Sequence, residues 1–151
     1  MITSYFTMKP SFLILSIFFI FLVLPVSDAD AQSRRTQAAD DDFNNMRYSL
    51  AIPKYKKAYA RAKRNKLERN RITYQMGECY RLMSQPKKAE AFYKRLTRTN
   101  YDRIEPLVLL RLADMQRANG SYDDALANYQ TYLERVPDDQ LGHAGMQSCK
   151  L

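Results

Sequence analysis

The sequence predicts an all-α protein built from repeated helix-turn-helix units. A spacing of small residues and tyrosine occurs three times: Gly77, Ala89 and Tyr93, then Ala113, Ala125 and Tyr129 at an offset of 36, and Ala39, Ala51 and Tyr55 at an offset of 38. Apolar residues within each unit recur at three- and four-residue steps, which is the period of an α-helix. A regular offset of this length is typical of a helical repeat array, in which each unit buries its apolar face against its neighbour.

The first element along the chain is predicted to be a signal peptide, residues 1–31. Residues 11–24 are apolar throughout, Lys9 precedes them, and Ala29-Asp30-Ala31 supplies small residues for cleavage before Gln32. A membrane-spanning helix needs about 20 apolar residues, so this run is short for one, although an uncleaved anchor remains an alternative. Translation starts at Met1 or at Met8.

The rest of the chain is predicted to form a short flexible segment, residues 32–35, and then a helical array over residues 36–150. The units are about 36–66, 68–100 and 103–136, with part of a fourth at 138–150. These boundaries give about three repeats plus part of a fourth, a helix-turn-helix solenoid.

Helix ends are marked by proline, glycine and acidic residues. Pro86 suits the first turn of the second helix of its unit. Asn119-Gly120 is expected to end a helix, Ser121 or Asp123 to cap the next one, and Pro137 to follow its end. In the first unit the acidic run at 40–42 weakens the prediction of a first helix. Pro53 is compatible with the second helix if that helix begins near Leu50.

Gly77 and Ala89 are predicted to lie where two antiparallel helices cross closely, because neither carries a large side chain. Tyr93, one turn after Ala89, would then fill the space towards the next unit. The same roles follow for Ala113, Ala125 and Tyr129 in the third unit.

These residues resemble the tetratricopeptide repeat (TPR) family. The resemblance covers roughly residues 36–150 and rests on Gly77, Tyr80, Ala89 and Tyr93, and on Leu112, Ala113, Gly120, Tyr122, Ala125, Tyr129 and Pro137. It implies a helical solenoid without catalytic activity whose first helices line a concave groove for a protein ligand. The chain departs from the family pattern at Thr73 and Leu109, which stand where a large aromatic residue is common.

A narrower resemblance is to the N-terminal TPR region of OmpA-like, type IX secretion-associated envelope proteins of Gram-negative bacteria. It is carried by "GECYRLMSQPKKAEAFYKRL" and "LADMQRANGSYDDALANYQTYLERVPDD". In those proteins the repeats precede a β-propeller-like segment and an OmpA-like domain, so we expect this chain to be a fragment or a truncated reading frame. The resemblance implies export to the periplasm or the periplasmic face of the outer membrane. It also implies a role in secretion or envelope assembly, with another envelope protein or a peptide segment as partner.

The groove expected from the resemblance contains six candidate ligand-binding residues. They are Tyr74, Glu78 and Arg81 of the second unit and, 36 residues later, Leu110, Asp114 and Arg117 of the third; Asp40 extends the acidic row into the first unit. A groove of alternating charge suits an extended peptide or a partner helix. The alternative is that each acid and the arginine three residues on form only an intrahelical ion pair, worth about 0.2–0.5 kcal/mol.

The charge of the chain is concentrated in one stretch. The formal net charge is +8, and residues 54–71 hold nine lysines or arginines with Glu68 as the one acid. This stretch is either the solvated face of a helix or a module that attaches to anionic lipid, glycan or peptidoglycan. Export makes nucleic acid the poorer candidate, and no nucleic-acid partner is expected.

No pattern of catalytic, metal-binding or cofactor-binding residues is recognisable in the sequence. His143 is the one histidine, and the sequence contains no CxxC, HExxH or glycine-rich phosphate loop. Paired acids such as Asp123-Asp124 and Asp138-Asp139 stand at predicted helix starts, where they offset the helix dipole. We therefore expect no enzyme activity, cofactor or metal.

The two cysteines, Cys79 and Cys149, are predicted not to form a disulfide with each other. They are 70 residues apart and occupy equivalent places two units apart. Four helix-to-helix steps would separate their Cα atoms by at least ~15 Å, whereas a disulfide tolerates about 7 Å. Cys79 is expected to be a buried thiol and Cys149 the more reactive one.

Overall fold

The computed structural model describes residues 28–150, and the chain divides into two compact units, residues 1–31 and 32–151. The described part contains seven α-helices and one 3-10 turn, and no strand. The elements are α2 (Asp28–Asn44), α3 (Tyr48–Arg61), α4 (Lys66–Leu82), α5 (Pro86–Arg98), η3 (Tyr101–Arg103), α6 (Leu107–Ala118), α7 (Tyr122–Arg135) and α8 (Gln140–Ser148). The predicted signal segment lies almost entirely outside the described residues, and none of the described helices is long and apolar enough to cross a membrane.

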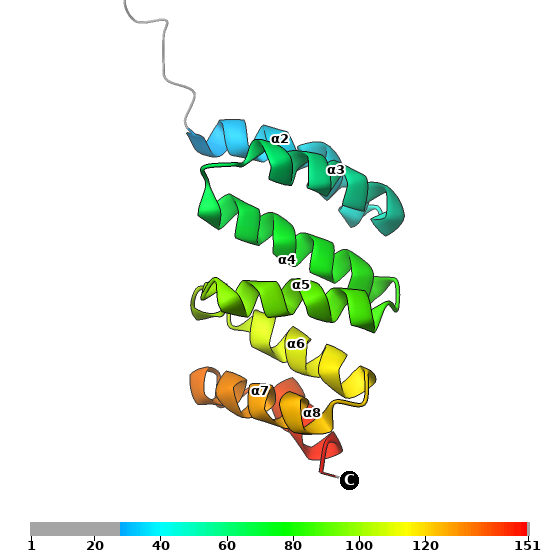
Figure 1. Cartoon of the computed structure of the whole chain (residues 1–151), viewed down its shortest axis with the longest axis vertical. Coiled ribbons are helices and arrows are strands. Elements are labelled where there is room, and N and C mark those ends of the chain that lie inside the picture. The colour runs from blue at the N-terminus through cyan, green and yellow to red at the C-terminus, as the bar shows by residue number, and fades with distance from the viewer. Residues whose placement is uncertain (1–27, 151) are drawn as a thin grey trace, which may run out of the picture. The chain divides into compact units, whose positions relative to one another are not determined.

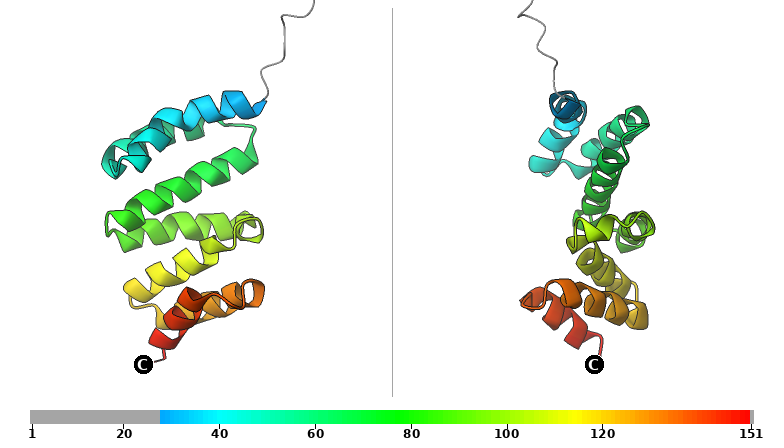
Figure 2. Two further views of the ribbon diagram at one scale, coloured as in Figure 1. Left: turned by 180° about the vertical axis from the view of Figure 1, so that it is seen from behind. Right: turned by 90° about the vertical axis from the view of Figure 1, so that its left-hand side faces the viewer.

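Within residues 32–151 the helices stack in chain order, each roughly antiparallel to the one before it (Figure 1). The view from behind shows the same succession from α3 to α8 (Figure 2). Helices α2 and α3, α4 and α5, and α6 and α7 form the three predicted units, and α8 follows as the first helix of the partial fourth. The predicted all-α helical repeat solenoid is confirmed.

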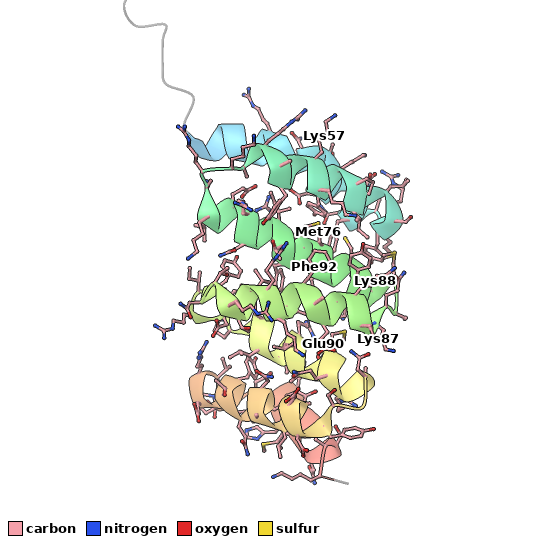
Figure 3. The ribbon with its side chains drawn as sticks, in the orientation of Figure 1. Lys57, Met76, Lys87, Lys88, Glu90 and Phe92 are labelled. Atoms are coloured by element: carbon pink, nitrogen blue, oxygen red, sulfur yellow. The ribbon has the colours of Figure 1, made fainter. Side chains whose placement is uncertain are left out.

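The core runs through the stack as three clusters of buried side chains, each shared between neighbouring helices. The first includes Tyr55, Ile72 and Met76, and Phe92 packs against it (Figure 3). The second and third are centred on the other two recurring tyrosines, Tyr129 and Tyr93. No unit completes its core alone, as expected for a repeat array.

Local sequence signals explain most helix ends. Helix α5 begins at Pro86, as predicted, and α6 ends at Asn119 and Gly120, whose φ of 82° is in the left-handed region that favours glycine. The carboxylate of Asp139 accepts a hydrogen bond of 2.9 Å from the backbone N–H of Gly142 and caps α8. Ser121 occupies the capping position of α7, but its side chain makes no capping hydrogen bond.

The first unit differs from the prediction in two places. Helix α2 begins at Asp28, so residues 32–35 are helical and not a flexible segment, because no glycine or proline interrupts residues 28–44. Helix α3 begins at Tyr48 and not near Leu50, which puts Pro53 beyond the first four residues. The helix therefore loses one internal hydrogen bond at Pro53.

The acidic run in the first unit stabilises its helices by pairing with basic groups. Asp42 is buried, and its carboxylate lies 2.8 Å from Arg47 and 2.6 Å from the Nζ atom of Lys54 on α3. The hydrogen bond from Lys54 lowers the pKa of Asp42, and that from Arg47 adds to the effect. The acids thus join α2 to α3.

Candidate functional site

A row of three acidic side chains follows the first helices of the units, and a tyrosine from the same unit binds each of them. The tyrosine hydroxyl groups donate to the carboxylates at 2.6 Å in the first unit, 2.5 Å in the second and 2.6 Å in the third. The pairs are Tyr55 and Asp40, Tyr93 and Glu78, and Tyr129 and Asp114, always fifteen residues apart. The acidic row is therefore tied to the core of each unit and is not simply open to a ligand.

The environment of these tyrosines favours their neutral form. Burial, above all, raises the pKa of Tyr55, Tyr93 and Tyr129 above the ordinary value of 10.0, and the adjacent carboxylates raise it further. The protonated hydroxyl groups remain hydrogen-bond donors through the neutral pH range.

An arginine from the next unit approaches the first two acids of the row. Arg71 on α4 lies 3.7 Å from the carboxylate of Asp40, and Arg111 on α6 lies 3.7 Å from that of Glu78. These two arginines do not occupy equivalent positions in the repeat, since 40 residues separate them and the repeat offset is 36. Repeat alignment alone therefore did not identify them as a pair.

The three groove candidates on α4 are packed more closely than predicted. Glu78 is buried, and Arg81 forms with it an intrahelical ion pair of 2.6 Å. Tyr74 is half-buried with its ring against Tyr93 in an edge-to-face contact, the ring centroids 6.1 Å apart. Burial raises the pKa of Tyr74 to about 12. On this helix the alternative of an ion pair within the helix describes Glu78 and Arg81.

The three candidates on α6 have different environments. Leu110 is 2% exposed and belongs to the second cluster, which corrects its predicted place on an open groove surface. Its burial arises because the side chain packs between helices in that cluster. Asp114 is half-buried, whereas Arg117 is exposed and its Nε atom donates to the hydroxyl of Tyr129 at 3.3 Å.

A hollow of about 280 Å³ between α6 and α8 brings these three candidates together. We call it the α6–α8 hollow; its lining residues are Leu110, Arg111, Asp114 and Arg117 on α6, and Leu141, Ala144, Gly145 and Ser148 on α8. The candidates on α4 do not line this hollow, but Arg111 connects the two groups through Glu78. The hollow combines two guanidinium groups, one carboxylate and an apolar surface.

Arg111 is the functional candidate that sequence reasoning missed. Its guanidinium group lies 3.6 Å from the carboxylate of Asp114 as well as near Glu78, yet its buried Nε–H makes no hydrogen bond within the described residues. The acceptor nearest to Nε is the carboxylate of Glu78, at the ion-pair distance of 3.7 Å and too far for a hydrogen bond. The corresponding residue of the second unit is Gln75, so the repeat gave no signal.

The predicted packing residues lie as follows. Ala89, Tyr93, Ala113, Ala125 and Tyr129 are fully buried, and Gly77 is buried in α4. Tyr80 is half-buried, stacked on Phe92 with ring centroids 5.3 Å apart. Pro137 is exposed after the end of α7, and its carbonyl oxygen lies 2.7 Å from Nε2 of His143.

The groups most often used in catalysis are dispersed or inert in the described part of the chain. Burial raises the pKa of the Cys79 thiol to about 12, which disfavours the reactive thiolate. His143 is exposed on α8. No three histidine, cysteine, aspartate or glutamate side chains between residues 28 and 150 form a group that could hold a metal ion.

Comparison with known proteins identifies two of the three complete units. Residues 73–100 and residues 107–139 each match the family model described as a tetratricopeptide repeat. These segments cover most of α4 with α5, and α6 with α7. No curated protein matches the chain.

Proposed function

We propose, from the premise that residues 73–100 and 107–139 are tetratricopeptide repeats, that this protein is a non-enzymatic scaffold that binds a segment of another protein. Repeats of this family typically mediate protein–protein interactions without doing chemistry. Their stacked helices present extended surfaces along which a ligand can lie.

The observation that carries the proposal is the guanidinium group of Arg111 at the α6–α8 hollow. Its Nε–H is buried and makes no hydrogen bond among the described residues, although the side chain lines a hollow of about 280 Å³. A carbonyl or carboxylate oxygen of a ligand would bind the guanidinium group from the hollow, in competition with Glu78, whose carboxylate lies 3.7 Å from Nε. A hydrogen bond to a charged group is worth about 1.5–3 kcal/mol, enough to fix the register of a bound segment.

The other lining residues of the hollow indicate which side chains the bound segment carries. Arg117 is exposed and can donate hydrogen bonds to a second carboxylate of the ligand. The carboxylate of Asp114 can accept a hydrogen bond from the ligand. Leu141, 67% exposed on α8, supplies an apolar surface at the same hollow. We therefore propose an extended peptide or helix with one acidic and one apolar side chain close together.

We place this scaffold in the bacterial envelope, at the periplasm or the periplasmic face of the outer membrane, in a role in secretion or envelope assembly. The proposal is supported by the apolar run 11–24 with small residues before Gln32, and by the resemblance to envelope TPR proteins. The mass of the protein isolated from its native host tests it, with a mature chain beginning at Gln32 in the periplasmic fraction as the expected result. A full-length chain in the cytoplasmic fraction would contradict export.

A site-specific cross-linker tests the binding surface. A photoreactive residue at the exposed position Leu141 should join the protein to one discrete partner, whereas the same group at Met46, also exposed but far along the chain, should not. Arg117→Glu in the Leu141 variant should weaken capture about tenfold, the effect of losing 1.4 kcal/mol. Lys57→Glu, an exposed charge reversal on α3 (Figure 3), should leave capture unchanged.

The cross-linking result separates the groove from non-specific attraction. Equal loss with Arg117→Glu and Lys57→Glu would mean that overall charge, and not the α6–α8 hollow, attracts the partner. Cross-linking from position 46 as strong as that from position 141 would mean that the α6–α8 hollow is not the binding site.

A second candidate function is attachment to an anionic lipid or glycan surface through residues 54–71. Seven of the nine basic residues in this stretch are exposed: Lys54, Lys56, Lys57, Arg61, Lys63, Arg64 and Lys66. Attachment of this kind is a screened attraction, so vesicle binding should collapse as salt rises above about 0.15 M. Partner binding that is insensitive to salt would favour the scaffold.

A further inference from the structure

A second hollow, of about 400 Å³, lies among α3, α4 and α5 and is strongly basic. We call it the basic hollow. Its lining residues are Tyr59, Lys63, Arg64, Lys66, Arg69, Asn70, Thr73, Arg95 and Thr99, five cations without a carboxylate. It shares no residue with the α6–α8 hollow. The chain brings Arg95 and Thr99 to it from a second unit, so it is not merely one face of the basic stretch 54–71.

Most of these cations have no acidic partner. Within residues 28–150 no carboxylate lies within ion-pair distance of Lys63, Arg64, Lys66 or Arg95, although Glu68 is close in sequence. Glu68 is buried and binds Arg71, at 3.1 Å, on the other side of its helix turn. Like charges gathered without counter-charges raise the local positive potential and attract anions.

One cation of the basic hollow is held in place. Arg69 lies 4.4 Å above the ring centroid of Tyr59 and donates a hydrogen bond of 2.6 Å to its hydroxyl. Stacking and hydrogen bonding reduce the freedom that the guanidinium group would lose on binding a ligand. The remaining N–H donors of Arg69 form a planar fork that suits two oxygens of one anion.

Asn70 adds an uncharged hydrogen-bond donor to the basic hollow. Its residue is only 9% exposed and lines the basic hollow, yet its side-chain amide makes no hydrogen bond within the described part of the chain. The neighbouring Thr73 and Thr99 already donate to backbone carbonyl oxygens of their own helices. The amide of Asn70 is therefore open to the hollow and can donate to a ligand there.

We propose that the basic hollow binds a phosphate group, either of a soluble phosphorylated compound or of a lipid headgroup. A phosphate ester carries about −1.5 to −2 charges on three acceptor oxygens. That density of charge and acceptors matches converging cations together with the amide donors of Asn70 and the positive end of α4, which begins at Lys66. A single carboxylate would leave most of these donors without a partner. The inference does not depend on the α6–α8 hollow. It narrows the second candidate function, attachment through residues 54–71, to the basic hollow.

Titration of the purified protein with inorganic pyrophosphate tests the proposal. We expect binding with a Kd on the order of 100 μM at low salt. Lys63→Gln with Arg95→Gln removes two cations of the hollow and should weaken binding at least about tenfold. Lys57→Gln with Lys87→Gln removes the same charge from exposed positions on α3 and α5 outside the hollow (Figure 3) and should change binding less than about twofold.

Asn70→Leu distinguishes a built site from simple attraction, because it leaves the net charge unchanged. It should weaken pyrophosphate binding several-fold while a thermal melt verifies that the variant folds. Equal weakening by the two double variants would contradict phosphate binding in the basic hollow. It would still allow attachment through the whole basic stretch. No binding up to about 5 mM pyrophosphate would contradict phosphate binding in the basic hollow as well.

Vesicles identify the source of the phosphate. If a lipid headgroup is the ligand, phosphatidic acid vesicles should bind where phosphatidylcholine vesicles do not, and pyrophosphate and Lys63→Gln with Arg95→Gln should both reduce the binding. If a soluble compound is the ligand, pyrophosphate should bind and neither vesicle should. Equal binding of a carboxylated polysaccharide such as polygalacturonate would contradict the preference for phosphate.

Discussion

Cys79 and Cys149 show how one repeat position acquires different chemistry in two units. Both are free thiols, but Cys79 is fully buried and Cys149 is half-exposed at the end of α8. Burial raises the pKa of Cys79 to about 12, so almost none of it is thiolate at neutral pH.

We therefore predict that iodoacetamide at about pH 8 alkylates Cys149 and spares Cys79 in the folded, non-reduced protein. Peptide mass spectrometry gives the extent at each site, and the same reaction in urea should label both. An intact Cys79–Cys149 cross-linked peptide would contradict the helix stacking itself.

Gly77 is the closest contact between α4 and the tyrosine of its unit. A Cβ atom at this position would lie 2.9 Å from the ring of Tyr93 and 3.3 Å from Cβ of Phe92. The Tyr93 ring is fully buried and held by its hydrogen bond to Glu78, so it has little room to withdraw.

Gly77→Ala should therefore lower the free energy of unfolding by about 1 kcal/mol. Overpacking costs about 1–3 kcal/mol, and the better helix propensity of alanine returns only about 0.5–1 kcal/mol. Urea denaturation measures the difference. A gain in stability would mean that the ring of Tyr93 shifts to accept the added methyl group.

Helix α8 approaches its neighbours most closely at its two glycines. A Cβ atom at Gly145 would lie 2.5 Å from the ring of Tyr129, and one at Gly142 would lie 2.9 Å from Leu133. The backbone of this nine-residue helix thus approaches α7 directly. One wall of the α6–α8 hollow depends on that approach.

Gly145→Ala should displace α8, because the added Cβ would meet the hydroxyl end of Tyr129, which its hydrogen bond to Asp114 holds in place. Hydrogen exchange should show the amides of residues 140–148 losing at least about tenfold protection, with those of α4 and α5 unchanged. Gln147→Ala, an exposed change on the same helix, is the matched control and should leave protection in place. Unaltered exchange in Gly145→Ala would show that the contact relaxes without cost.

The positions of the helices were predictable from the sequence because the residues that recur at the repeat offset are those that pack between neighbouring helices. Pro86 and Asn119-Gly120 gave ends that agree with α5 and α6. The tyrosine–acid pairs were also within reach, since both rows recur and stand fifteen residues apart. Arg111 was not, because a long side chain reaches its partner from a position that the repeat does not share.

The basic hollow could not be predicted for a similar reason. Arg95 and Thr99 are distant in sequence from the stretch 54–71 and join it only through the stacking of α5 on α4. The burial of Leu110 likewise depends on which helices meet around it.

At the scale of the whole molecule, Tyr55, Tyr93 and Tyr129 should make the free energy of unfolding fall at alkaline pH. Their pKa values are raised in the folded state above the ordinary 10.0, so folding retains protons that the unfolded chain releases. The stabilisation is fully present below pH 10.0 and is lost progressively as pH rises towards the higher folded values.

We predict a melting temperature that is level from neutral pH to about pH 9 and falls steeply above pH 10. Tyr93→Phe with Tyr129→Phe should lower stability at neutral pH, by about 1 kcal/mol per lost hydrogen bond, and flatten the alkaline fall. Tyr122→Phe, at an exposed tyrosine, is the control and should leave the profile unchanged. An alkaline fall as steep in the double variant as in the parent would show that other groups cause it.

The arginines that reach from one unit to the acid of the preceding unit give the stack a mechanical property. Arg71 and Arg111 each stand 3.7 Å from their acids. The pair of Arg71 and Asp40 is partly exposed and worth about 1 kcal/mol or less, whereas Glu78 and the Nε atom of Arg111 are buried. Salt screens the exposed bridge between Arg71 and Asp40 and screens the buried one much less, so we expect the joint between the first two units to soften first as ionic strength rises. A bound segment that draws Arg111 away from Glu78 would soften the joint between the second and third units. Occupation of the α6–α8 hollow would then be felt as a change of superhelical pitch on the opposite side of the second unit.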